Sequence, residues 1–167
     1  MKGVGVSLWL VPEGEVHRRL AALIESLGRR FGGPVFDPHV TLLAGAPGPA
    51  AEAVRRAEAA ARASRPFPVR FAGCEAGTGY FRRLYLRVEP SAELLALHAA
   101  ARDAFGRAHE PPLFPHLSLM YGAPPPAALV EEVRPQAPDG FEARALDVYA
   151  TEGEVPRWHR VRRLHLR

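Results

Sequence analysis

The stretch Pro38-His39-Val40-Thr41-Leu42-Leu43-Ala44-Gly45 returns later in the chain as Pro115-His116-Leu117-Ser118-Leu119-Met120-Tyr121-Gly122. Proline, histidine, one leucine and glycine match at the same offsets, and a hydroxyl residue follows each histidine by two positions. In a β-strand this spacing puts the histidine and the hydroxyl on one face, while the apolar residues between them face a core. We expect the two strands to lie side by side, so that two imidazoles and two hydroxyls converge on one small anion.

A single histidine–hydroxyl pair would carry little weight, because such a short motif recurs by chance. Two copies inside a longer match are more informative. An internal duplication explains the shared proline, leucine and glycine through strand entry, packing and exit. It gives no reason for a histidine and a hydroxyl on the face turned away from the core. We therefore predict that His39 and His116 are catalytic and that Thr41 and Ser118 bind phosphate.

The hydrophobic periodicity around the motifs predicts a similar order of elements in each half of the chain. For the first half we expect a strand at 4–10, a helix at 13–31, the His39 strand, a helix ending before residue 66 and a strand from residue 67. For the second half we expect a strand at 84–88, a helix at 91–105, the His116 strand, a short helix at 124–134 and a strand from about 141. A last strand at 158–166 closes the chain.

Two local details follow from the same patterns. Val4 is expected to belong to the first strand and to share one face with Val6 and Leu8, with Ser7 and Trp9 on the opposite face. The glycine-rich segment at 73–79 lacks the Lys-Ser/Thr of a phosphate-binding loop and is expected to form a turn.

The repeated order indicates an internal duplication, with two lobes related by a pseudo-twofold axis and both histidines near that axis. We expect a single domain spanning 1–167, with a first half of about 1–78 and a second half of about 79–167. No segment is long enough to act as a linker between independent domains.

The 167 residues carry a net charge of +4, and Lys2 is the only lysine, so arginine supplies the positive charge. A GC-rich coding sequence would produce such a composition, and attraction to phosphates is the functional alternative. The single cysteine, Cys74, cannot form an internal disulfide. We find neither a signal peptide nor a membrane-spanning run and no cluster with metal-ligand spacing, so we expect a cytoplasmic protein without metal or cofactor.

A pair of histidines suits the hydrolysis of phosphate esters. Imidazole titrates near neutrality, so one ring can be neutral while the other is protonated. The neutral ring can take a proton from an attacking water, and the protonated ring can give one to the departing ester oxygen. Thr41 and Ser118 can donate hydrogen bonds to the non-bridging oxygens.

These residues resemble the 2H phosphoesterases, which carry two such histidine–hydroxyl motifs, and most of all their cyclic phosphodiesterase branch in tRNA splicing. The resemblance rests on the second motif with Tyr121, on 7–12 (Ser-Leu-Trp-Leu-Val-Pro), on 77–81 (Gly-Thr-Gly-Tyr-Phe) and on the late Trp158. It implies a duplicated, two-lobed α+β fold with an antiparallel sheet in each lobe, helices on the outer faces and a cleft between the lobes.

The resemblance also implies an activity, which is hydrolysis of nucleoside 2′,3′-cyclic phosphates to 2′-phosphates and of ADP-ribose 1″,2″-cyclic phosphate. It places Tyr121 with the phosphate and Trp9 and Tyr80 in the substrate pocket, and by analogy His116 activates water while His39 protonates the leaving oxygen. From the residues alone, Trp9 stacks on a base or ribose or packs under a helix.

Two other functions stay open. One is an RNA-end enzyme that acts on 2′,3′-cyclic ends of oligonucleotides or on 2′-5′ linkages, as a ligase-like relative. The other is a non-catalytic module that holds a nucleotide or RNA phosphate between the lobes. In every case we expect a monomer whose partner is a small cyclic-phosphate nucleotide or an RNA end, with no membrane contact.

Overall fold

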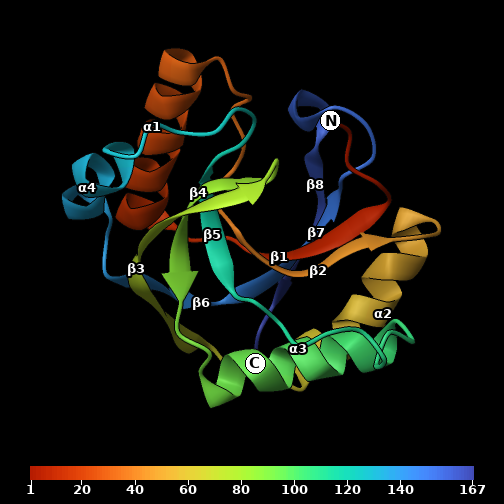
Figure 1. Ribbon diagram of the computed structural model, residues 1–167. Coiled ribbons are helices and arrows are strands. Elements are labelled where there is room, and N and C mark those ends of the chain that lie inside the picture. Colours follow the sequence, from red (N-terminus) through yellow and green to blue (C-terminus); the bar gives the residue numbers. More distant parts are fainter.

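Alternating apolar residues build one continuous sheet of eight strands, and the helices lie around it (Figure 1). The computed structural model describes residues 1–167. The strands are β1 (Val6–Leu10), β2 (Val40–Ala46), β3 (Phe67–Gly79), β4 (Arg82–Val88), β5 (His116–Met120), β6 (Gly140–Ala143), β7 (Ala145–Ala150) and β8 (His159–His165). The α-helices are α1 (Gly14–Phe31), α2 (Ala50–Arg62), α3 (Ala92–Ala104) and α4 (Leu129–Val133), with 3₁₀ helices at Arg134–Gln136 and Val155–Arg157.

The strand order β6-β3-β4-β5-β2-β1-β7-β8 is antiparallel throughout and has an internal symmetry. Read outward from the centre, β5 corresponds to β2 and β4 to β1. The two strands that carry the repeated motif are therefore the central neighbours of the sheet, as predicted. Each is joined on its outer side by the strand that opens its half of the chain.

Two helices pack across the two halves of the sheet. Helix α1 follows β1 but packs against β5, and α3 follows β4 but packs against β2. Figure 1 shows α1 and α4 on one side of the curled sheet and α2 and α3 on another. One hydrophobic cluster of 35 buried residues includes side chains from both halves. The predicted α+β architecture is confirmed.

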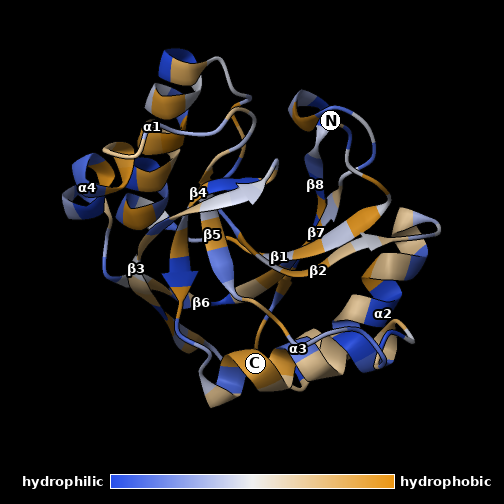
Figure 2. Cartoon of the chain, viewed as in Figure 1, coloured by the Kyte–Doolittle hydropathy of each residue, from blue (hydrophilic) through white to orange (hydrophobic).

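Helix positions follow from their sequences. Leu20, Ile24 and Leu27 recur at the spacing of one helical face and are buried, so α1 presents an apolar stripe to the sheet. Figure 2 shows hydrophobic and hydrophilic residues alternating along this helix. Gly32 ends α1 in a left-handed conformation with φ of 68°. Ser91 begins α3, because its hydroxyl accepts a hydrogen bond from the Leu94 amide.

Three local predictions were wrong. Val4 is 67% exposed and precedes β1, because Gly5 turns the chain with φ of 58° where a Cβ atom would meet the Ala46 carbonyl oxygen at 2.2 Å. The segment 73–79 is the second half of β3 rather than a turn, since its backbone pairs with β4. The strand expected from 141 is two strands in opposite halves of the sheet: β6 pairs with β3, and β7 pairs with β1 and β8.

No helix combines the length and the apolar character needed to cross a membrane.

Candidate active site

The pairing of β2 with β5 brings the two motifs together. Val40 lies opposite Leu117, and both are fully buried on the core face, as predicted. Continuing this antiparallel register by one residue places His39 across from Ser118 and Thr41 across from His116. The other face of the two strands therefore presents each histidine opposite the hydroxyl residue of the other motif.

All four side chains line one cavity of about 530 Å³. The cavity lies on the face of the sheet turned away from the main core. Its walls are Lys2, Gly3, Val4, Ser7, Trp9, His39, Thr41, Ala44, Gly45, Phe81, Arg107, His116, Ser118, Tyr121, Thr151 and Trp158. The predicted convergence of two imidazoles and two hydroxyls is thus present in the fold.

The two imidazoles are held in the same way. His39 Nδ1–H donates to the carbonyl oxygen of Asp37 at 2.6 Å, and His116 Nδ1–H donates to the carbonyl oxygen of Phe114 at 2.8 Å. In each motif a proline separates the acceptor from the histidine. A neutral imidazole with its proton on Nδ1 keeps an unprotonated Nε2. Each ring can therefore offer Nε2 to accept a proton, or to donate one once it is protonated.

His39 is the more deeply buried of the two. Only 5% of its surface is exposed, and the Trp9 ring stacks on it with centroids 3.5 Å apart and planes 8° apart. The pKa of His39 falls from 6.5 to about 4, mainly because burial disfavours the charged ring. The bond to the Asp37 carbonyl and the Asp37 carboxylate raise the pKa, while the charge of His116 lowers it.

His116 is only partly buried and has a different set of neighbours. The Tyr85 ring meets it edge-on, and Phe114 lies beside it. Burial lowers the pKa of His116, and the positive charge of Arg82 acts in the same direction, while the bond to the Phe114 carbonyl raises it. Both imidazoles therefore favour the neutral form in the free protein.

The hydroxyl groups predicted to donate to phosphate differ in burial and in their present contacts. Ser118 is buried and donates its hydroxyl proton to the Phe81 carbonyl at 2.8 Å, so it must rotate to donate to a phosphate. Thr41 is partly exposed to the cavity. Tyr121 lies at the cavity wall with its ring stacked on Phe36 at 3.7 Å, and burial raises the pKa of its hydroxyl.

The aromatic residues are only partly where the sequence places them. Trp9 lines the cavity but is 2% exposed, because it is stacked on His39 and on Tyr149 rather than open to a base. Tyr80 was expected in the substrate pocket but is not among the residues that line the cavity. Its neighbour Phe81 lines the cavity instead, together with Trp158.

Lys2 and Arg107 line the cavity and were not identified from the sequence. Arg107 forms an ion pair with Glu110 and donates to the Ala44 carbonyl at 2.7 Å, which fixes it beside the end of β2. Ala44 lies three residues beyond Thr41, a distance of roughly 10 Å along a strand. The sequence offers one indication of a role for Lys2, which is that it is the single lysine of the chain.

Arg82 and Arg83 both have structural partners. Arg83 donates to the carbonyl oxygens of Gly122 and Thr78 at 2.7 and 2.5 Å, and it thereby ties the β3–β4 turn to the end of β5. Arg82 lies over the Phe114 ring. No group of three or more His, Cys, Asp or Glu side chains has the arrangement of a metal site.

Comparison with known sequences gives a consistent result. The family model described as cyclic phosphodiesterase-like protein matches residues 4–166. A cyclic phosphodiesterase of Arabidopsis thaliana is 30% identical over 131 residues, which cover 78% of this chain and 70% of the plant protein. A 2′,3′-cyclic-nucleotide 3′-phosphodiesterase of Kluyveromyces lactis is 32% identical over 166 residues, covering 87% of this chain and 78% of the yeast protein.

Solved structures share the fold at low sequence identity. E. coli LigT in complex with 3′-AMP superimposes with a TM-score of 0.68 at 16% identity and covers 99% of both chains. A protein of Thermus thermophilus gives a TM-score of 0.65 at 20% identity over 98% of both chains. These structures agree in fold, and the family model and the plant relative show that the chain belongs to the cyclic phosphodiesterase-like family of 2H phosphoesterases.

Proposed function

We propose that this protein hydrolyses cyclic phosphodiesters of nucleotides, with His39 and His116 acting as a general acid–base pair and without a metal ion. One observation carries the proposal: the two imidazoles line the same cavity, each with Nδ1–H bonded to a backbone carbonyl and Nε2 left to exchange a proton. Phosphodiesterases among its sequence relatives support the same chemistry.

The reaction follows from these groups. A water oxygen forms a bond to phosphorus, and its proton passes to the neutral imidazole. The bond from phosphorus to the ester oxygen breaks, and that oxygen takes a proton from the other, protonated imidazole. A 2′,3′-cyclic phosphate then gives a 2′-phosphate and a free 3′-hydroxyl. Thr41, a rotated Ser118 and Tyr121 donate to the non-bridging oxygens, where charge is redistributed in the transition state.

Family resemblance assigns water activation to His116 and protonation of the leaving oxygen to His39. In this assignment His39 must be protonated when it acts, although burial disfavours its charged form. The negative charge of a phosphate between the rings is the group that can raise the His39 pKa. The acid is thus charged only when substrate is present, while the partly exposed His116 serves as the base.

A substrate panel assayed in EDTA tests the proposal. The panel contains a nucleoside 2′,3′-cyclic phosphate, ADP-ribose 1″,2″-cyclic phosphate and an RNA with a 2′,3′-cyclic end. We expect turnover of at least one of them, with a 2′-phosphate as product from a 2′,3′-cyclic substrate. Binding without product from all three would indicate a phosphate-binding module, and activity lost to chelator would indicate a metal enzyme.

RNA ends are a second substrate class that one observation favours. Lys2 and Arg107 place positive charge in the cavity wall near the end of β2. A substrate with a further phosphate beyond the cyclic one, as in an RNA end or in the diphosphate of ADP-ribose 1″,2″-cyclic phosphate, can reach this charge, whereas a nucleoside cyclic phosphate has no such group. The ratio of kcat/KM for the cyclic RNA end to that for the nucleoside cyclic phosphate separates the two classes.

A further inference from the structure

The two motifs differ at the residue that accepts the histidine's Nδ1–H bond. Asp37 precedes His39 by two positions, and Phe114 precedes His116 by two positions. Both supply a backbone carbonyl, at 2.6 and 2.8 Å. Only the first motif has a side chain at this position that can itself accept hydrogen bonds. The pseudo-symmetry of the site is therefore broken at Asp37.

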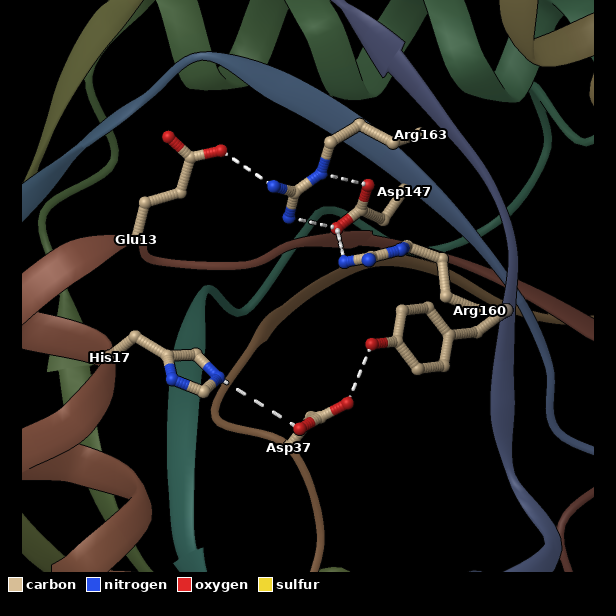
Figure 3. A network of polar contacts seen from close by, with 7 residues as sticks. Glu13, His17, Asp37, Asp147, Arg160 and Arg163 are labelled. Atoms are coloured by element: carbon tan, nitrogen blue, oxygen red, sulfur yellow. Dashed lines mark hydrogen bonds and ion pairs between the residues drawn. The ribbon is translucent and has the colours of Figure 1, made fainter.

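The Asp37 side chain bonds to a residue on the far side of β1. Its Oδ2 accepts the Tyr149 hydroxyl at 2.7 Å, and its Oδ1 lies 3.9 Å from His17 Nε2. Figure 3 shows the Asp37 carboxylate between His17 on α1 and a tyrosine hydroxyl, which belongs to Tyr149 on β7. This bond joins residues 112 positions apart in the chain.

Tyr149 in turn supports the ring that covers His39. It stacks on Trp9 with centroids 3.9 Å apart, and Trp9 stacks on His39 at 3.5 Å. The strand order β2-β1-β7 puts His39 and Tyr149 on opposite sides of Trp9. The contacts run from His39 through Trp9 and Tyr149 to the Asp37 carboxylate, and return from the Asp37 carbonyl to His39. We call Asp37, Tyr149 and Trp9 the His39 brace.

A buried ion pair holds the strand that carries Tyr149. Asp147 lies opposite Trp9 in the β1–β7 register and is 1% exposed. Its carboxylate accepts two hydrogen bonds from Arg163 at 2.9 and 2.8 Å, and Arg160 lies 3.7 Å away, as Figure 3 shows. A bidentate pair of this kind fixes β7 against β8 and keeps the Tyr149 ring under Trp9.

We propose that Asp37 and Tyr149 are positioning residues for His39. The Asp37 carbonyl holds the Nδ1 edge of the imidazole, and the Tyr149 hydroxyl holds Asp37 by its carboxylate. Tyr149 also supports one face of the imidazole through Trp9, so that Nε2 stays aimed into the cavity. The inference rests on the proposed function, in which Nε2 transfers a proton. Proton transfer requires close alignment, and a ring that can turn spends less time aligned. His116 has no equivalent carboxylate and keeps only its carbonyl bond and its contacts with neighbouring rings.

Three variants test the brace, with a matched control. Tyr149→Phe removes the hydroxyl, Asp37→Ala removes its acceptor, and Asp37→Asn keeps an oxygen that can accept the Tyr149 proton. Asp103→Ala removes an exposed carboxylate from α3 and is the control. With a nucleoside 2′,3′-cyclic phosphate, we expect Tyr149→Phe and Asp37→Ala to lower kcat about tenfold with KM within about twofold. Asp37→Asn should keep most of the activity, and Asp103→Ala should match the unaltered protein.

Nitrogen NMR of the imidazoles supplies a readout that a loss of stability would not produce. At pH 7 we expect His39 to be fixed in the Nδ1–H tautomer and to become a mixture of tautomers in Tyr149→Phe and Asp37→Ala. The His116 signals should stay unchanged in the same samples, which makes that residue an internal reference.

Unchanged His39 signals in both variants, or an equal change in His116, would overturn the inference. The inference would also be overturned if Asp37→Asn lowered kcat and changed the His39 signals as much as Asp37→Ala. The NMR measurement needs no turnover. If the protein hydrolyses none of the panel, the proposed function is refuted, and the NMR signals of His39 still test the His39 brace.

Discussion

The Trp9 ring lies flat on the His39 ring, with their centroids 3.5 Å apart and their planes 8° apart. This contact covers one face of the imidazole and so adds to the burial that lowers the pKa of His39 to about 4. In the free protein at pH 7, His39 is therefore neutral. If it protonates the leaving oxygen, it must gain its proton together with the substrate.

The first prediction concerns that proton. Binding of a nucleoside 2′-phosphate, the expected product, should raise the pKa of His39 because the anion stabilises the imidazolium form. A titration followed by NMR, with and without the nucleotide, measures the change. A proton that appears on His116 while His39 stays neutral would reverse the assignment of acid and base.

The second prediction concerns stability and pH. The folded-state pKa of His39 is about 4, below the ordinary value of 6.5, so protonation favours the unfolded chain. The free energy of unfolding is unaffected by His39 protonation above pH 6.5. It falls by about 3 kcal/mol as the pH is lowered from 6.5 toward 4. Urea unfolding of His39→Gln should show a weaker fall in stability over this window, and His109→Gln, at an exposed loop position, should not differ from the unaltered protein. An undiminished pH dependence in His39→Gln would contradict the burial argument.

The sequence predicts the central part of this site because strand geometry is local. Alternation along 38–45 and 115–122 places His39, Thr41, His116 and Ser118 on one face, and the structure brings that face to a cavity. The pairing of the two strands follows from their equivalent places in a duplicated chain. Helices such as α1 were predictable for a similar reason, since an apolar stripe and a closing glycine mark them.

What the sequence does not reveal depends on tertiary contacts between distant segments. Lys2 and Arg107 reach the cavity from a terminal segment and from a loop, and no periodicity marks either position. Trp9 was predicted to meet a base or to pack under a helix, whereas Tyr149, which is distant in sequence, joins it in a stack with His39. Gly77 indicates a turn by composition, yet a Cβ atom there would lie 2.4 Å from the Arg82 carbonyl oxygen, so close pairing of β3 and β4 requires the glycine.

The third prediction separates the two motif hydroxyls. Ser118 bonds to the Phe81 carbonyl and is buried, so Ser118→Ala should cost about 1 kcal/mol of stability as well as activity. Thr41 is partly exposed to the cavity, so Thr41→Val should lower kcat at least tenfold with little change in stability. Thermal unfolding and steady-state kinetics on both variants make the comparison. Equal stability losses would show that the two hydroxyls are held alike.

The fourth prediction concerns substrate choice. Lys2 is exposed and lines the cavity, so Lys2→Met should raise KM for the cyclic RNA end more than for the nucleoside cyclic phosphate. The difference should shrink as salt is added. Arg55→Met, at an exposed position on α2, provides the control. An equal rise in KM for both substrates would place the charge of Lys2 at the cyclic phosphate itself.

If His39 and His116 together carry out the reaction, both His39→Ala and His116→Ala must slow the hydrolysis of a nucleoside 2′,3′-cyclic phosphate in EDTA. Proton transfer partners contribute about a hundredfold or more each. We predict at least that loss in both variants, with folding intact by circular dichroism. Full activity in either variant, or restoration of activity by a divalent cation, would show that the two imidazoles do not carry out the reaction.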